Sequence, residues 1–337
     1  MDPERYSRQI LFAPIGRAGQ ERLAASRVVI VGCGALGTAQ AALLARAGVG
    51  RIRLVDPDYV EQSNLQRQLL FDEEDAARTL PKAVAAAQKL KAVNSDIEVE
   101  GVVSDVMAQN AEELTHAFDL ILDGTDNFET RFLLNDVSLK SKIPWVYGAV
   151  VGSAGVTMTV LPGRTACLAC VLPTFPEGTL ETCDTVGVIG SAVTWTASLQ
   201  VTEALKLLLG QEDKLRGTLL SYDIWTNNRH EVVPQKDPEC RACGHRDYAY
   251  LRGELSHSTV LCGRNAVQIR PPSPRQLDLH DLRKRLEAIG TVRANDYLLQ
   301  CRLQPYEMTV FADGRAIFKG TDSEGVARGL YAKYIGT

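Results

Sequence analysis

The stretch VVIVGCGALG, residues 28–37, constrains the fold of this chain more than any other feature. Residues 27–31 are apolar, β-branched and bounded by glycine, which predicts a short buried strand. Three glycines follow in a Gly-x-Gly-x-x-Gly pattern: Gly32, Gly34 and Gly37. Residues 35–47 are rich in alanine and leucine and stop at Gly48, which predicts a helix. A strand, a glycine turn and a helix in this order form a phosphate-binding unit, because amide groups at the helix N-terminus can face a phosphate.

An acidic residue ends the second predicted strand, at 51–56. Asp56 lies 19 residues after Gly37, where a carboxylate can bind ribose hydroxyls. The alternative is a glycine-rich turn without a ligand, but the order of strand, turn, helix and acidic residue favours a nucleotide site. The pattern does not name the nucleotide, so an NAD-dependent oxidoreductase stays open here. The Walker A sequence of many ATPases is missing from the chain.

The next 200 residues alternate between predicted strands and predicted helices. Further strands are predicted at 97–103, 118–123, 144–151, 155–161 and 217–233. Helices are predicted at 81–93, 110–117, 127–141 and 187–209. This alternation predicts a Rossmann-like α/β fold, a mainly parallel sheet with helices on both faces, with the last strands antiparallel. A different β-α-β-β-α pattern begins near residue 250, so we expect two domains, residues 1–249 and a small α+β domain at 250–337.

Composition excludes several classes of protein. The net charge of −4 and the lack of a basic stripe argue against nucleic-acid binding. No run of 18 apolar residues could span a membrane, and the first twelve residues, MDPERYSRQILF, lack the apolar core of a signal peptide. Eight cysteines are too few for a disulfide scaffold in 337 residues, and four of them form two Cys-x-x-Cys pairs. We therefore expect a cytoplasmic protein with metal-binding or catalytic thiols.

The segment after Asp56 distinguishes between nucleotides. DPDYVEQSNLQRQLLF, residues 56–71, and TLPKA, residues 79–83, supply a cluster of polar and basic side chains: Asn64, Arg67, Gln68 and Lys82. A dehydrogenase needs no such cluster, whereas a triphosphate does, because Arg and Lys neutralise its oxygens and the charge that develops as pyrophosphate leaves. Each basic residue taken alone could instead lie on a solvated face.

A second acidic motif, DGTDN at 123–127, follows another predicted strand. Ligands of open α/β sheets bind outside the carboxyl ends of the strands, so this loop belongs to the same candidate site. Asp126 is a candidate Mg²⁺ ligand, because Mg²⁺ prefers carboxylate and phosphate oxygens. The alternative role for Asp126 is the N-cap of the helix at 127–141.

Together these motifs carry a family resemblance. RYSRQILF, VGCGALGT, VDPDYVEQSNLQRQ, LPKA, DGTDN, the paired Cys-x-x-Cys motifs and TCDTVGVIG occur in an order that resembles the ThiF/MoeB family, bacterial relatives of ubiquitin-activating enzymes. The resemblance covers about residues 4–245, with Ala35 replacing a glycine of many members. It implies ATP-dependent adenylation of the C-terminal Gly-Gly carboxylate of a small ubiquitin-like sulfur carrier, with release of pyrophosphate. Such enzymes serve thiamine (thiazole) or molybdopterin biosynthesis.

The resemblance also implies residue roles. Asp56 becomes the ribose ligand, Asp126 the Mg²⁺ ligand, and Arg8 an arginine donated across a homodimer interface to the partner's ATP. The implied nucleotide-binding positions are Gly32, Gly34, Ala35, Gly37, Asp56, Ser63, Asn64, Leu65, Gln66, Arg67, Lys82, Asp126 and Asn127. The implied catalytic positions are Arg8, Arg67, Lys82, Asp126 and Cys183. A sulfur donor such as a cysteine desulfurase or a rhodanese would be a further partner.

Two Cys-x-x-Cys pairs predict a structural zinc site. The four thiols are Cys167, Cys170, Cys240 and Cys243. Their spacing within each pair suits tetrahedral zinc, but 69 residues separate the pairs, so the fold must bring them together. A redox pair is the alternative, which two pairs without a thioredoxin-like pattern do not fit well.

The remaining cysteines receive separate interpretations. Cys183 lies in a Pro-, Gly- and Thr-rich segment at about 173–186, where the resemblance places a thiol that can bond covalently to the carrier in ThiF-type enzymes and is dispensable in MoeB-type enzymes. An exposed cysteine without a role is the alternative. Cys33, Cys262 and Cys301 are interpreted as small core residues.

The tail after residue 250 resembles that of some ThiF-type enzymes and lacks a recognisable catalytic constellation, so we expect it to dock a carrier or a sulfur-handling partner. A non-catalytic adaptor for a ubiquitin-like protein is the other alternative to an enzyme, and it would be expected to lack one of the phosphate-binding residues found here.

Overall fold

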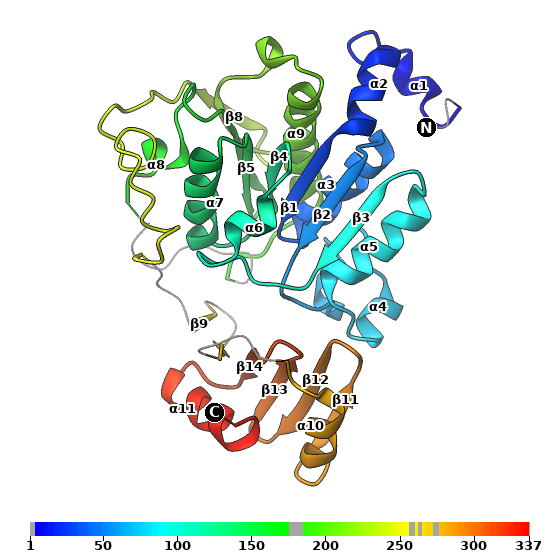
Figure 1. The fold of residues 1–337 in the computed structure, drawn as a ribbon, viewed down its shortest axis with the longest axis vertical. Coiled ribbons are helices and arrows are strands. Elements are labelled where there is room, and N and C mark those ends of the chain that lie inside the picture. The colour runs from blue at the N-terminus through cyan, green and yellow to red at the C-terminus, as the bar shows by residue number, and fades with distance from the viewer. Residues whose placement is uncertain (1–3, 175–184, 256–259, 262–264, 272–275, 337) are drawn as a thin grey trace. The chain divides into compact units, whose positions relative to one another are not determined.

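A computed structural model describes residues 4–174, 185–255, 260–261, 265–271 and 276–336 (Figure 1). The chain divides into two compact units, Met1–Ser256 and His257–Thr337. Residue 249, the predicted end of the first domain, lies close to the end of the first unit. Among the described residues, none of the helices has the length and apolar character needed to cross a membrane.

The first unit is built on an eight-stranded sheet with the order β3-β2-β1-β4-β5-β6-β7-β8. Its strands are β1 (Arg27–Val31), β2 (Arg51–Val55), β3 (Glu98–Val102), β4 (Leu120–Asp123), β5 (Trp145–Val151), β6 (Ala154–Val160), β7 (Leu219–Asp223) and β8 (Asn228–Val232). The pairs among β1 to β5 are parallel, and those from β5 to β8 are antiparallel. The predicted Rossmann-like fold is therefore confirmed, antiparallel strands included.

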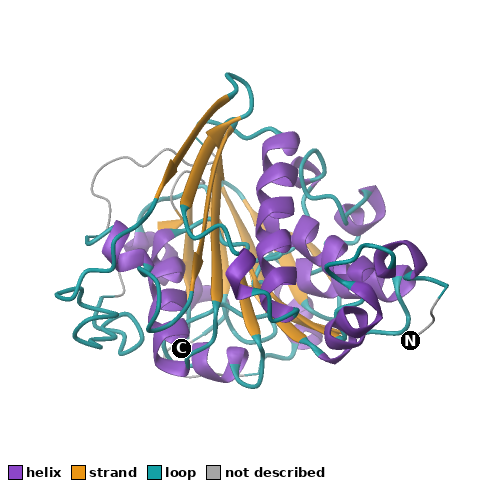
Figure 2. Ribbon diagram, turned by 90° about the horizontal axis from the view of Figure 1, so that it is seen from above, coloured by secondary structure: helices purple, strands orange, loops and turns teal. Residues whose placement is uncertain are grey.

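Helices cover both faces of this sheet (Figure 2). They are α1 (Ser7–Ile10), α2 (Gly16–Ala25), α3 (Ala35–Ala47), α4 (Glu73–Ala77), α5 (Lys82–Val93), α6 (Ala111–Thr115), α7 (Phe128–Ser141), α8 (Leu168–Val171) and α9 (Gly190–Leu208). Short 3-10 turns occupy Gln62–Asn64 and Glu212–Lys214.

Strand β1 shows why both faces of the sheet are apolar. Val28 and Ile30 belong to the core cluster under α3 and α5, and Val29 and Val31 to the cluster under α7, because successive side chains alternate between faces.

Local signals gave the helix boundaries with mixed success. Helix α3 spans the predicted residues 35–47 and ends at Gly48, whose φ of +80° is the left-handed conformation that favours glycine. The helix predicted at 187–209 begins later, at Gly190, because Val188 forms a parallel bridge to Gly152, and its neighbours Gly187 and Ile189 make the two backbone hydrogen bonds of that bridge. Helices α1, α2, α4 and α8 were not predicted; three of them have only four or five residues.

The second unit contains a six-stranded antiparallel sheet with the order β11-β12-β13-β14-β10-β9. Its elements are β9 (Val260–Leu261), β10 (Ala266–Ile269), α10 (Leu279–Leu286), β11 (Thr291–Ala294), β12 (Leu298–Leu303), β13 (Tyr306–Phe311), β14 (Ala316–Lys319) and α11 (Glu324–Tyr334). Leu282 and Leu286 of α10 and Tyr331 of α11 pack on one core with the sheet.

The small α+β class is confirmed, but the strand count was too low. The expected β-α-β-β-α pattern has one strand before its first helix and two after it, whereas the described residues form β9 and β10 before α10 and β11 to β14 between α10 and α11. The extra reversals come from local turns: Pro305 lies between β12 and β13, and Gly314, with a φ of +87°, lies between β13 and β14. Cys301 is buried in this core, as expected, whereas Cys262 lies outside the described residues.

Candidate nucleotide site and cysteine cluster

The carboxyl ends of three neighbouring strands form one edge of the large sheet. Val31 at the end of β1 pairs with Val55 at the end of β2 and with Asp123 at the end of β4. The loops that follow these strands therefore start side by side. Strands β2 and β3 lie on one side of β1, and β4 and β5 lie on the other, so the order of strands changes direction between β1 and β4. Ligands of open α/β sheets bind at such a switch point.

The three loop glycines have different reasons to be glycine. Gly32 has a φ of +90°, and a Cβ there would lie 2.4 Å from the carbonyl oxygen of Gly124. A Cβ on Gly37 would lie 1.9 Å from the carbonyl oxygen of Gly32. A Cβ on Gly34 would meet only Nε2 of Gln68, at 3.8 Å. Packing therefore requires the first and third glycines, while the second leaves open space on the outer side of the loop.

Asp56 fastens the glycine loop to the end of β2. Its side chain is buried, one carboxylate oxygen accepts the amide proton of Cys33 at 2.6 Å, and the other accepts that of Asp58 at 2.8 Å. Burial raises the pKa of Asp56 to about 6, against the opposing effect of the Lys82 charge. Cys33 itself is fully buried in the core, as the sequence predicted.

Lys82 reaches the same edge through a backbone connection that the sequence did not reveal. Val60 N–H donates to Leu80 at 2.8 Å, and Lys82 N–H donates to the carbonyl of Asp58 at 2.8 Å, so the segment before α5 runs along the segment after β2. Nζ of Lys82, a residue only 6% exposed, lies 3.1 Å from the carboxylate of Asp58. Sequence reasoning grouped Asp56 and Lys82 correctly but missed Asp58, whose signal was its position two residues after Asp56.

The turn at Gln62–Asn64 arranges the polar cluster predicted for the triphosphate. Asn64 is buried, and its Oδ1 accepts the amide proton of Glu61 at 3.1 Å. Arg67 is half-buried and donates from Nη1 to the carbonyl of Ser63 at 3.0 Å. Gln68 is buried beside Gly34, and its Oε1 has no hydrogen-bond partner among the described residues. A buried unpaired amide oxygen is costly in a protein interior, which suits a place where a ligand arrives.

The other residues predicted in this segment differ in exposure. Ser63 and Gln66 are exposed, whereas Leu65 packs partly against the core under α3. Ala35 is the first residue of α3, and its methyl group packs beside the start of α9.

The loop after β4 is organised by a buried carboxylate. Asp123 accepts the amide proton of Thr125 at 2.9 Å and its hydroxyl proton at 2.7 Å. Asn127, not Asp126, is the N-cap of α7, since its side chain accepts the amide proton of Thr130 at 2.8 Å. The alternative interpretation of Asp126 as this cap is therefore wrong. Asp126 is exposed at the edge where the glycine loop begins.

Sequence reasoning missed Arg131, the basic partner of this loop. The side chain is buried, donates from Nη2 to the carbonyl of Thr125 at 2.7 Å, and has Nε 3.6 Å from Oδ2 of Asp123. Burial raises the pKa of Asp123, and the Arg131 charge opposes that shift. The Asp-x-Thr spacing at the strand end indicated the turn, but no local pattern indicated the arginine eight residues later.

Arg8 lies far from the glycine loop of its own chain. It is exposed on α1, and the adjacent Gln9 donates to the carbonyl of Ala47, at the last residue of α3. The glycine loop precedes the first residue of α3, so the 13-residue helix separates the two by about 18 Å along its axis. Figure 1 shows α1 and α2 at the end of the sheet where β1 begins. Cys183 lies outside the described residues.

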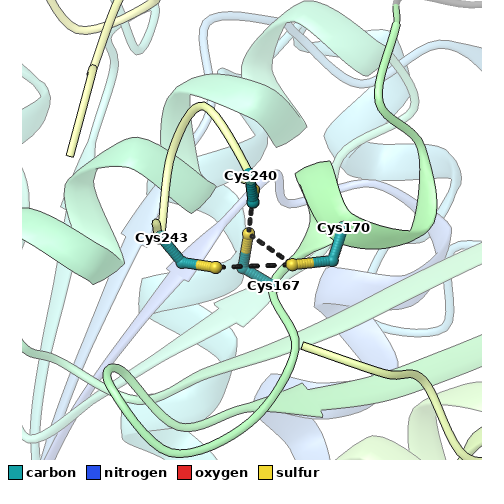
Figure 3. A group of neighbouring side chains, drawn as sticks. All are labelled: Cys167, Cys170, Cys240 and Cys243. Carbon is teal, nitrogen blue, oxygen red and sulfur yellow. Dashed lines mark hydrogen bonds between the residues drawn. The ribbon is translucent and has the colours of Figure 1, made fainter. Parts of the chain in front are cut away.

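The four predicted metal ligands meet in space, although their pairs are far apart in the chain (Figure 3). Their ligand atoms all lie within 4.8 Å of one another. Sγ of Cys167 is 3.8 Å from that of Cys170 and 3.7 Å from that of Cys240, and Cys170 and Cys243 are 3.3 Å apart. Zinc–sulfur bonds of about 2.3 Å give tetrahedral edges of about 3.8 Å, so the cluster fits zinc.

The electrostatics of the cluster also call for a cation. Burial and the neighbouring thiols raise the pKa of Cys167 to about 12. The four thiols would therefore lose their protons together only if a cation offset the repulsion between the thiolates, and a zinc ion would supply that charge. All four thiols are used, which leaves no open coordination position and indicates a structural site.

Comparison with known proteins places the chain in a family. Residues 6–242 match the ThiF family. The chain belongs to the ThiF family. It is 49% identical over 336 residues, 98% of this chain and 99% of the relative, to the sulfur carrier protein ThiS adenylyltransferase of Bacillus subtilis. It is 38% identical, over 77% of this chain and 96% of the relative, to a sulfur carrier protein adenylyltransferase of Thermus thermophilus.

Solved structures agree on the fold of this ThiF-family chain. The crystal structure of Escherichia coli MccB with ATP superposes with a TM-score of 0.62 and 23% identity, covering 71% of this chain and 74% of MccB. At that identity the likeness concerns the fold alone.

Proposed function

We propose that this ThiF-family protein adenylates the C-terminal carboxylate of a small ubiquitin-like sulfur carrier, with ATP as the other substrate. The observation that carries the proposal is the joint position of the glycine loop, Asp56 and Lys82 at one sheet edge. The names of the Bacillus and Thermus relatives, which are adenylyltransferases of sulfur carrier proteins, support the same activity.

The reaction needs positioning and charge neutralisation rather than a protein nucleophile. A carboxylate oxygen of the carrier forms a bond to the α-phosphorus of ATP, and the bond from that phosphorus to the β-phosphate bridging oxygen breaks. The products are a carrier acyl-adenylate and pyrophosphate. In our assignment Asp56 binds the ribose, the amides at the start of α3 face the phosphates, and Asn64, Arg67 and Lys82 contact the triphosphate, where they offset the charge on the leaving group.

Two metal ions complete the assignment. Asp126, an exposed carboxylate at the site edge, would hold Mg²⁺ together with phosphate oxygens, as Mg²⁺ prefers. Bound there, Mg²⁺ would neutralise phosphate charge. The cysteine cluster would hold zinc in a structural role and join the segment after β6 to the segment before Tyr250.

The position of Arg8 supports a homodimer with shared active sites. Arg8 and the glycine loop lie at opposite ends of α3, so Arg8 can serve a nucleotide only in a partner subunit. Arg8→Ala and Asp126→Ala should each be inactive alone. When the two variants are mixed and exchange subunits, about half of the dimers are hybrids with one complete site, and about a quarter of wild-type activity should return.

A matched mixture controls for this result. Arg67 and Asp126 belong to the same protomer's site in our assignment, so a mixture of Arg67→Ala with Asp126→Ala should stay inactive. Two results would contradict the assignment of Arg8 to the partner's site: adenylation activity that returns in both the Arg8→Ala and the Arg67→Ala mixture with Asp126→Ala, or activity that returns in neither.

Thiazole formation for thiamine is the pathway that we propose, because the Bacillus relative is named for the ThiS carrier and matches the chain over its whole length. In the later steps, the Cys183 thiolate would attack the carbonyl carbon of the carrier acyl-adenylate, forming a carbon–sulfur bond to the carrier while the acyl–phosphate bond breaks and AMP leaves. A cysteine desulfurase or a rhodanese would supply sulfur. The second unit would dock the carrier or that sulfur donor.

Mass spectrometry of the carrier tests the proposed reaction. Incubation of the enzyme, MgATP and a carrier that ends in Gly-Gly should add one AMP to the carrier. The same carrier without its final glycine is the control. A modified truncated carrier, or an unmodified intact carrier with ATP bound, would contradict the proposal.

A further inference from the structure

Helix α7 carries two adjacent polar residues at its centre, Asn135 and Asp136. Both side chains are fully buried, and the residues around them, Leu133, Leu134 and Val137, are buried apolar residues of the core. Burying an amide and a carboxylate costs free energy unless each is hydrogen-bonded. Their partners therefore indicate what the two positions do.

Asn135 binds the first cysteine pair. Its Oδ1 accepts the amide proton of Leu168 at 2.8 Å. Leu168 lies between Cys167 and Cys170 and is the first residue of α8. The hydrogen bond thus pairs a helix N-terminal amide that has no partner within α8, and it fixes the backbone that presents both thiols.

Asp136 binds the second cysteine pair. Its carboxylate receives the Arg241 guanidinium in a two-pronged contact, with Nη2 3.1 Å from Oδ1 and Nη1 3.4 Å from Oδ2. Arg241 lies between Cys240 and Cys243. Oδ2 of Asp136 also accepts the amide proton of Tyr250 at 3.0 Å, which fixes the chain just after the second pair.

Aromatic stacking completes this attachment. The ring of Tyr250 lies on that of Phe132 of α7, with centroids 5.0 Å apart and an interplanar angle of 11°. The Arg241 guanidinium also lies over the ring of Tyr250, 5.4 Å from the ring centroid. The second pair is thus held to α7 by an ion pair, a backbone hydrogen bond and a stacked ring.

We propose that Asn135 and Asp136 are positioning residues for the metal, which hold the two cysteine pairs against one turn of α7 so that four thiolates converge. Because 69 residues separate the pairs, bringing them together loses chain entropy. When both pairs are attached to α7, this entropy is lost on folding and not on metal binding, so the metal binds to a site that is already assembled. The inference rests on zinc in the cysteine cluster and not on the adenylation reaction.

Zinc binding by the full-length protein tests this role. Asp136→Asn keeps the side-chain shape but removes the charge that binds Arg241, and Asn135→Leu keeps the volume but removes the acceptor for Leu168. Each should weaken zinc binding about 10- to 100-fold, as measured by competition with a chromogenic zinc chelator. Arg241→Lys keeps the charge but loses the two-pronged contact, so its zinc affinity should fall between those of Asp136→Asn and wild type.

A matched control separates metal positioning from general stability. Glu203 on α9 is also buried, with Lys206 Nζ at 2.6 Å and the Arg216 amide at 2.9 Å, and Glu203→Gln removes its charge away from the cysteines. Zinc should raise the Tm of wild type and of Glu203→Gln equally, and that of Asp136→Asn much less.

Two results would overturn the proposal. If Asp136→Asn and Asn135→Leu bind zinc as tightly as wild type, or if zinc raises their Tm as much as that of Glu203→Gln, the two residues only stabilise the fold. If wild type binds no zinc, the metal assignment fails as well, while the adenylate measured on the carrier still decides the proposed reaction.

Discussion

Substitution of two glycines by alanine should separate the packing role of the loop from its ligand role. A Cβ on Gly37 would lie 1.9 Å from the carbonyl oxygen of Gly32, so backbone must move. Overpacking of a well-packed interior costs about 1–3 kcal/mol or more, and a backbone clash belongs at the upper end. A Cβ at Gly34 would meet only Nε2 of Gln68, at 3.8 Å, which is an ordinary van der Waals contact. The free energy of unfolding of Gly34→Ala should change by less than about 1 kcal/mol.

Nucleotide affinity should follow a different pattern. A methyl group on Gly34 would occupy the outer side of the loop, where we place the phosphates, so Gly34→Ala should weaken ATP binding at least about tenfold, or about 1.4 kcal/mol. Urea denaturation measures the stability of both variants, and isothermal titration calorimetry measures ATP binding to Gly34→Ala. Normal ATP affinity in a fully folded Gly34→Ala protein would refute the placement of phosphates on this side of the loop.

Three further predictions follow from the buried charges and from Cys183. The pKa of Asp56 is about 6 in the folded protein and about 3.9 in the unfolded chain, so its protonation contributes stability that is present below pH 3.9 and lost as the pH rises through 6. The free energy of unfolding of Asp56→Asn, measured by urea denaturation, should therefore rise relative to that of wild type between pH 4.5 and 7.5. A difference between the two proteins that does not depend on pH would contradict this. Arg131→Met leaves the buried carboxylate of Asp123 without its cation and should cost about 3 kcal/mol at pH 7.5, less at low pH where Asp123 is protonated; a loss that does not depend on pH would argue against the ion pair. Cys183→Ala should keep ATP–pyrophosphate exchange and stop sulfur transfer to the carrier, so loss of exchange would assign the thiol to the first step.

The parts that the sequence predicted well are those set by local patterns. The buried strand at 27–31 and the helix at 35–47 follow from β-branched residues, the loop glycines and Gly48, all within about twenty positions. The four metal ligands followed from Cys-x-x-Cys spacing, because a thiol pair indicates its chemistry wherever the chain places it. Asp56 and Asp123 lie at one edge of the sheet, since parallel strands align their carboxyl ends, whereas the backbone contact that brings Lys82 to Asp58 had no local sequence signal.

The parts that escaped prediction depend on contacts between distant segments. Asn135 and Leu168 are 33 positions apart, and Asp136 and Arg241 are 105 apart, so no window of sequence joins them. In the helix pattern of α7 these two polar residues would be expected to face water. Arg131 is a different case: its partners Thr125 and Asp123 lie only six and eight positions earlier, but no turn or helix pattern predicts that its side chain contacts them. The distance of Arg8 from the loop likewise required the length and direction of α3.

ATP–pyrophosphate exchange tests the central claim most directly. Labelled pyrophosphate enters ATP only if the enzyme reversibly transfers AMP to an acceptor carboxylate. With Mg²⁺ and a carrier that ends in Gly-Gly, we expect exchange that disappears when the carrier is omitted or its terminal carboxylate is amidated. Exchange that persists with the amidated carrier, or no exchange with any Gly-Gly carrier while NAD rather than ATP binds to the protein, would contradict the account.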